Sequence, residues 1–194
     1  MRLIAVCLLV SALIPSLSRA QDVPVFAIST ADSSIKFNVK ASVAIGGTFD
    51  NWNATLTFTS PNVTTGVLDV EIQAASVDTG SGMKDSKLKS SDFFDAANNP
   101  LITFKSTNIS QTGPNTFEVD GNFTIRGVTR LEKLTLAVSG VGTGSGQIKG
   151  TLYFDRKDYG MNSGIPFIRI ANRVEVNVDL KGNRVSGPRL VLKQ

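Results

Sequence analysis

Apolar and polar residues alternate along most of this chain, and this period of two is the feature that most limits its fold. Ile35, Phe37 and Val39, for example, alternate with polar side chains. The same pattern recurs in segments 56–58, 68–73, 102–104, 117–125, 134–138, 148–154 and 174–180. Because successive side chains of a strand point to opposite faces, each run predicts a strand with one face in a core and the other in water. Roughly eight or more such strands with almost no helix predict an all-β domain, either a barrel or a sandwich.

The alternation stops once, between residues 76 and 106. A short helix is predicted here, within residues 81–98, where lysines are interleaved with Met83 and Leu88. Phe93 and Phe94 follow directly. Proline disfavours helix both at its own position and at the one before it, so the helical part ends before Pro100 and a new strand begins at Leu101. A basic turn of helix beside two aromatic rings is typical of a lid over the end of a β-structure.

Three stretches resemble the YceI-like family in both order and spacing. The first combines SVDTG (76–80), KDSKLKSSDFFD (84–95) and NPLITFKST (99–107); the others are GNFTIRGVTR (121–130) and DRKDYGM (155–161). The resemblance implies a single antiparallel, lipocalin-like barrel that holds a long polyisoprenoid lipid in the periplasm. Glycines inside strand patterns support the barrel physically, because a closing sheet bulges or bends at such residues. These glycines are Gly46, Gly47, Gly121 and Gly150.

The chain departs from the family pattern near the expected lid. Lys87 stands where members often carry histidine, Lys84 replaces an arginine, and Asn99 replaces the tyrosine before the proline. Asn122 and Phe123 stand in place of a Leu-Thr pair. These changes bear on the specificity for a lipid head group rather than on the fold.

The first 20 residues read as a signal peptide. Arg2 precedes an apolar run at 3–14, and small residues lead to a cleavage site after Ala20. We therefore expect one domain, residues 21–194, that is periplasmic or secreted. The apolar run is too short to span a bilayer, so no stable membrane anchor is expected. The single cysteine, Cys7, lies in this leader, so no disulfide is expected.

Composition excludes several kinds of chemistry. The chain has no histidine, which removes Ser-His-Asp catalysis and, without mature cysteine, the usual zinc, copper and haem ligands. We expect no metal, and no cofactor other than a bound isoprenoid lipid or quinone. Apart from the two leader arginines, 18 basic residues face 16 acidic ones, so a nucleic-acid partner is not expected. Catalysis by carboxylates on a similar lipid remains an alternative function. The carboxylates near the lid and the third motif are Asp85, Asp92, Asp95, Asp155 and Asp158.

Aromatic residues on the inward parity of strands, or at strand ends, are the candidate ligand contacts. An eight-stranded barrel can fill itself with side chains or hold one small ligand, so periodicity leaves a hollow and a filled interior open. The resemblance implies the hollow one. The candidates for cavity and lid are Phe37, Trp52, Phe58, Phe93, Phe94, Phe104, Phe123, Phe154 and Tyr159.

Basic residues within the three motifs are the candidates for an anionic head group, because arginine can hold a phosphate through two parallel hydrogen bonds. They are Lys84, Lys87, Arg126, Arg130 and Arg156. For Arg156 we also expect a structural ion pair with Asp155 or Asp158. Three functions thus remain open: a lipid-binding protein without catalysis, an enzyme that uses lid carboxylates, and a filled structural or stress-response barrel.

Overall fold

The computed structural model describes residues 23–43, 45–140, 143–164 and 167–192. The predicted signal peptide and its cleavage site lie outside these residues. The strands are β1 (Val25–Ala41), β2 (Ile45–Phe49), β3 (Trp52–Phe58), β4 (Gly66–Gln73), β5 (Val77–Asp78), β6 (Leu101–Gly113), β7 (Thr116–Ile125), β8 (Val128–Ser139), β9 (Ser145–Asp155) and β10 (Ile170–Ser186). The helices are α1 (Gly82–Lys89) and three 3-10 turns, η1 (Val63–Thr65), η2 (Ala74–Ser76) and η3 (Arg156–Tyr159). The all-β prediction is confirmed.

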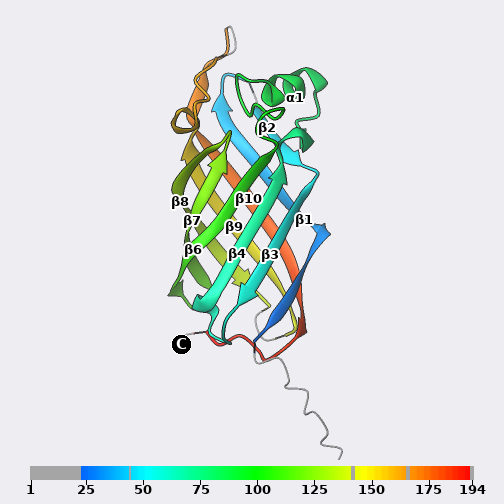
Figure 1. Cartoon of the computed structure of the whole chain (residues 1–194), viewed down its shortest axis with the longest axis vertical. Coiled ribbons are helices and arrows are strands. Elements are labelled where there is room, and N and C mark those ends of the chain that lie inside the picture. The colour runs from blue at the N-terminus through cyan, green and yellow to red at the C-terminus, as the bar shows by residue number, and fades with distance from the viewer. Residues whose placement is uncertain (1–22, 44, 141–142, 165–166, 193–194) are drawn as a thin grey trace, which may run out of the picture.

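All strands pair antiparallel in one sheet, in the order β3-β4-β6-β7-β8-β9-β10-β1-β2-β5, and the sheet curls into a barrel (Figure 1). The two ends of this order belong to one bent hairpin, because β2 runs on into β3 and β4 runs on through η2 into β5. On one side β2 pairs with β1, and on the other it pairs with β5 through Thr48–Asp78 and Phe49–Val77, so that this bent hairpin closes the barrel. Gly47 permits this closure, since a Cβ there would lie 2.5 Å from the carbonyl oxygen of Asp78. The structure thus selects the barrel over the sandwich.

Only one of the glycine positions coincides with a bulge. The register between β6 and β7 shifts between Ser106 and Asn108, directly beside Gly121. The ladders at Gly46, Gly47 and Gly150 show no register shift, so of the bulge or bend expected there only a bend remains. Those glycines are needed for close packing instead. At Gly150, for example, an added Cβ would lie 3.0 Å from a methyl carbon of Val178.

The lid, which we define as residues 82–99, covers one end of the barrel (Figure 1). It consists of α1 and the turns that follow it. Backbone N–H groups of Phe94 and Asp95 donate to the carbonyls of Leu88 and Ser90, both at 2.9 Å, and fold these turns back against the helix. Strand β6 begins at Leu101, directly after the proline, as predicted. Across the described part of the chain, no helix has the length and apolar character that crossing a bilayer requires.

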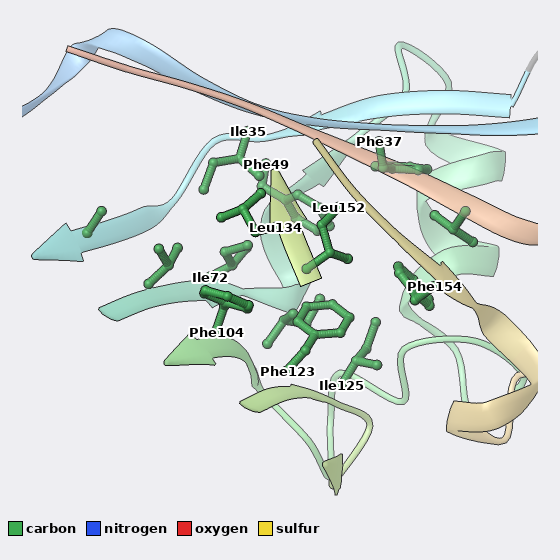
Figure 2. Close-up of a cluster of buried hydrophobic side chains, with 14 of the residues drawn as sticks. Ile35, Phe37, Phe49, Ile72, Phe104, Phe123, Ile125, Leu134, Leu152 and Phe154 are labelled. Atoms are coloured by element: carbon green, nitrogen blue, oxygen red, sulfur yellow. The ribbon is translucent and has the colours of Figure 1, made fainter. Parts of the chain in front are cut away.

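The interior away from the lid is filled by side chains. Figure 2 shows aliphatic and aromatic side chains inside the sheet, of which Ile35, Phe104, Leu134 and Leu152 belong to this filled part, whereas others such as Phe37 and Phe154 lie toward the lid end. Buried residues of this filled half include Ile35, Leu68, Phe104, Phe117, Val119, Leu134, Leu136, Leu152 and Leu180. The barrel is therefore packed like an ordinary core over part of its length.

Candidate functional site

A cavity of about 680 Å³ occupies the barrel under the lid. This volume lies within the range of roughly 300–1,000 Å³ that is typical of small-molecule sites. Its walls come from seven strands and are almost wholly apolar. The strand residues are Phe37, Val39, Ile45, Phe49, Ile72, Ile102, Phe123, Ile125, Phe154, Ile170, Val174 and Val176. The cavity thus occupies the lid end of the barrel, whereas the core away from the lid is filled except for a small pocket of about 70 Å³ beside Phe26 and Leu56.

Two phenylalanine rings of the lid cover part of this cavity, which reaches the surface beside the exposed Val43 and Met83. Phe93 and Phe94 are both buried and both line the cavity. The ring of Phe94 packs against Phe49 at 5.9 Å and against Phe37 at 6.5 Å, measured between ring centroids. Phe94 therefore also holds the lid on the strands.

A second aromatic cluster forms another part of the wall. Phe123, Phe154 and Tyr159 lie with ring centroids 5.2 to 5.5 Å apart. The first two line the cavity, whereas Tyr159 packs behind them. Its hydroxyl donates to Glu132 at 2.7 Å. Burial, and then this hydrogen bond, raise the pKa of Tyr159.

Four of the nine predicted aromatic residues do not line the cavity, which corrects their placement. The ring of Phe104 lies over Gly121, where an added Cβ would be 2.7 Å from its Cε2 atom. Phe58 packs against Phe26 with ring centroids 5.8 Å apart. Trp52 packs against the core from a partly buried position, and Tyr159 lies behind the wall. A direct role in binding stays a prediction for the other five.

Two carboxylates tie the lid to the barrel. Asp85 accepts hydrogen bonds from the backbone N–H and the hydroxyl of Thr79, at 2.8 and 2.7 Å. Asp92 accepts from the ammonium of Lys87 and, at 3.0 Å, from the hydroxyl of Ser163. The Thr79 hydroxyl lowers the pKa of Asp85, and the bonds from Lys87 and then Ser163 lower that of Asp92. Both groups are therefore ionised at neutral pH and fasten the lid at its two sides.

Among the predicted head-group residues, Lys84, Lys87 and Arg156 line the cavity. Arg126 and Arg130 do not. The guanidinium of Arg126 donates to the carbonyl of Gly160, and that of Arg130 donates twice, at 3.3 Å, to the carbonyl of Asp158. These two arginines hold the turn around η3.

Arg156 is buried, and its partners differ from those expected. It donates to backbone carbonyls and not to Asp155 or Asp158, which corrects the predicted ion pair. Asp155 instead caps η3 by accepting the N–H of Lys157 at 2.8 Å. The carbonyls that Arg156 satisfies are those of Met161, Ser163 at 3.0 Å and Ala171 at 3.2 Å. Through these bonds Arg156 fixes the backbone that follows η3, next to the cavity wall to which Arg156 itself contributes.

Two observations bear on the acidic residues of the lid and on metal binding. A carboxyl that acts as a general acid needs a raised pKa, whereas those of Asp85 and Asp92 are lowered. Within the same residues, no group of three or more acidic side chains is arranged to hold a metal ion.

Several wall residues were not predicted. Phe49 is the largest of them, and the period-two spacing from Ile45 through Gly47 could have found it. Ile168 and Ile170 also line the cavity, where β10 begins. The sequence at 160–169 has no regular alternation of apolar and polar residues, so its pattern gave no signal for Ile168.

Comparison with known proteins gives a consistent result. The family described as "YceI-like domain" matches residues 26–182. A UPF0312 protein of Shewanella sp. (strain ANA-3) is 30% identical over 142 residues, which cover 68% of this chain and 72% of that protein. A UPF0312 protein of Azotobacter vinelandii is 33% identical over 84 residues, covering 43% and 44%. This chain spans about half the length of that protein, and it likewise covers 51% of the UPF0312 proteins of Pseudomonas.

Solved structures share the fold. BcnA of Burkholderia cenocepacia superposes with a TM-score of 0.73 at 25% identity, covering 80% of this chain and 99% of that one. A Campylobacter jejuni YCEI protein gives 0.60 at 26% identity, covering 71% and 84%. A polyisoprenoid binding domain from Saccharophagus degradans, described as implicated in plant cell wall breakdown, gives 0.64 at 14% identity, covering 83% and 99%. At that identity the last likeness concerns the fold alone.

Proposed function

This chain belongs to the YceI-like family, and from that premise we propose that it holds an isoprenoid lipid, of polyprenyl or quinone type, under its lid. The observation that carries the proposal is the cavity of about 680 Å³ with its apolar wall. A branched hydrocarbon chain has no polar groups, so it needs no hydrogen-bond partners in such an apolar wall. Recognition would come from buried area, at roughly 25 cal/mol per Å².

Polar groups at one side of the cavity suit the head of such a lipid. Lys84, Lys87 and Asp92 line the cavity on the lid side, while the opposite walls are aliphatic and aromatic. We therefore place the hydrocarbon chain among the strands and the head beside the lid. A lipid longer than the cavity would extend past the lid into solvent or into a partner.

We further propose that the protein acts in the periplasm or outside the cell, after loss of residues 1–20. The role would be transport or storage without catalysis. An enzyme that uses lid carboxylates receives less support, because the pKa values of Asp85 and Asp92 are lowered. A barrel that binds nothing receives less support because the space under the lid is hollow.

Lipid extraction from protein purified from its native compartment, followed by mass spectrometry, tests the proposal. We expect one isoprenoid species in a defined ratio to protein. Protein stripped of lipid should also take up a polyprenol or ubiquinone added in detergent. If no lipid copurifies and neither probe can be loaded, the proposal is wrong.

A further inference from the structure

Three exposed apolar side chains surround the open end of the cavity. Val43 lies in the turn between β1 and β2, Met83 in the first turn of α1, and Phe167 in the segment before β10. They are 43%, 86% and 105% exposed. Val43 and Met83 also line the cavity. Single exposed apolar side chains are common on protein surfaces, but several that gather at one opening and are flanked by polar residues indicate an interaction surface.

Hydrogen bonds place two of these segments side by side. The backbone N–H of Ser42 donates to the carbonyl of Arg169 at 3.0 Å, and the N–H of Arg169 donates to the hydroxyl of Ser42 at 3.2 Å. The turn with Val43 and the segment with Phe167 therefore form one edge of the opening. Helix α1, with Met83, covers the same end of the barrel (Figure 1). We call Val43, Met83 and Phe167 the rim tips.

Positive charge accompanies each tip. Lys40, Lys84 and Arg169 are exposed, and each lies within three positions of a rim tip. The three segments 40–43, 82–85 and 167–170 contain one acidic residue, Asp85. Its carboxylate is engaged by Thr79. These three segments, which carry the tips, thus hold more basic than acidic residues, although Asp92 and Asp95 balance Lys87 and Lys89 in the rest of the lid.

We propose that this rim docks on a lipid bilayer that carries anionic head groups. Separate apolar tips flanked by basic residues match an interface in which hydrocarbon lies just below phosphates. A protein partner is a poorer match, because the tips protrude singly from three segments and do not form a continuous groove. Docking would set the open end of the cavity against the bilayer. If the cavity holds an isoprenoid lipid, as proposed above, the lipid could then enter or leave without crossing water.

Vesicle cosedimentation of the mature protein tests the proposal. The probe vesicles contain about 30 mol% phosphatidylglycerol in phosphatidylcholine, and the reference vesicles contain phosphatidylcholine alone. We expect preferential binding to the anionic vesicles, weakened in about 1 M salt, where the screening length falls to about 3 Å. Protein stripped of lipid should bind in the same way, so this result does not depend on the cavity being occupied.

Variants separate the apolar contribution from the charged one. The double variant Met83→Ser, Phe167→Ser should lower the partition coefficient about ten-fold or more. Lys84→Gln should lower it about five-fold on anionic vesicles and little on the reference vesicles. Val185→Ser is the matched control, because Val185 is 66% exposed near the end of β10, away from the lid. Circular dichroism confirms that each variant remains folded.

Four results would overturn the proposal. One is absence of binding to anionic vesicles. Another is a double variant that binds as the unmodified protein does, and a third is a control variant that loses as much. The fourth is a concentration-dependent dimer that Phe167→Ser dissociates, since the tips would then cover one another in a second copy of the chain.

Discussion

Replacing Val176 by phenylalanine tests whether the space under the lid is empty in solution. Val176 lies on β10 and lines the cavity. A larger ring at this position enters a space of about 680 Å³ and displaces no side chain. Each additional buried methylene is worth about 0.8 kcal/mol. We therefore expect the free energy of unfolding to stay constant or to rise by about 1–2 kcal/mol.

The same substitution at Val119 provides the control. Val119 lies on β7, is 0% exposed, and belongs to the filled half of the barrel. Its neighbours leave no room for a ring, and overpacking of this kind costs about 1–3 kcal/mol. Both variants replace valine by phenylalanine. They differ only in whether the valine faces the cavity or the filled core.

Urea unfolding followed by circular dichroism measures the stability of both variants, and mass spectrometry measures their lipid content. Val176→Phe should keep its stability and lose bound lipid, whereas Val119→Phe should lose stability. If Val176→Phe is destabilised as much as Val119→Phe, the space is not empty. If it keeps a full complement of lipid, the ligand lies elsewhere.

Three further outcomes are expected. Asp85 and Asp92 have lower pKa values in the folded protein than the usual 3.8, so their ionised forms stabilise the lid at any pH above 3.8. This stabilisation is lost as the pH falls through the pKa values of the folded protein. Hydrogen exchange in residues 82–99 should therefore accelerate in acid. Equal exchange rates at neutral and strongly acidic pH would contradict this. Tyr159→Phe removes the hydrogen bond to Glu132 but keeps the buried ring, so the free energy of unfolding in urea should fall by roughly 0.5–1.5 kcal/mol. An unchanged unfolding midpoint would show that this bond does not stabilise the fold. The intact mass of the exported protein should correspond to a chain that begins at Gln21, and a retained leader or an acyl adduct would refute the predicted cleavage.

Much of the fold follows from local sequence pattern. The alternation of apolar and polar residues is set by the two faces of a strand, so it predicted the strands without knowledge of their partners. The lid was predictable because the alternation breaks at 76–106 and Pro100 limits the helix. The motifs around these elements were sufficient to recognise the family, which the match over residues 26–182 confirms.

The partners of the arginines could not be read from sequence. Arg156 has aspartates at neighbouring positions, which suggested an ion pair. In the fold, its guanidinium donates to the carbonyls of Ser163, which follows η3, and of Ala171, which lies in β10. Backbone carbonyls are present at every residue, so no residue type in the sequence marks the ones that an arginine will meet.

Sequence alone determined which residues face inward, and the tertiary structure decided which of them enclose a cavity. Phe104 and Phe123 show the difference, because they share the inward parity and pair directly across β6 and β7. The ring of Phe104 occupies the space over Gly121 and fills the core, whereas that of Phe123 packs with Phe154 and lines the cavity. Parity specifies a face of the sheet, but not where a residue lies along the barrel axis or whether side chains from facing strands meet. The distances between side chains on facing strands are fixed only when the barrel closes. They leave the space under the lid open, whereas the core away from the lid is filled.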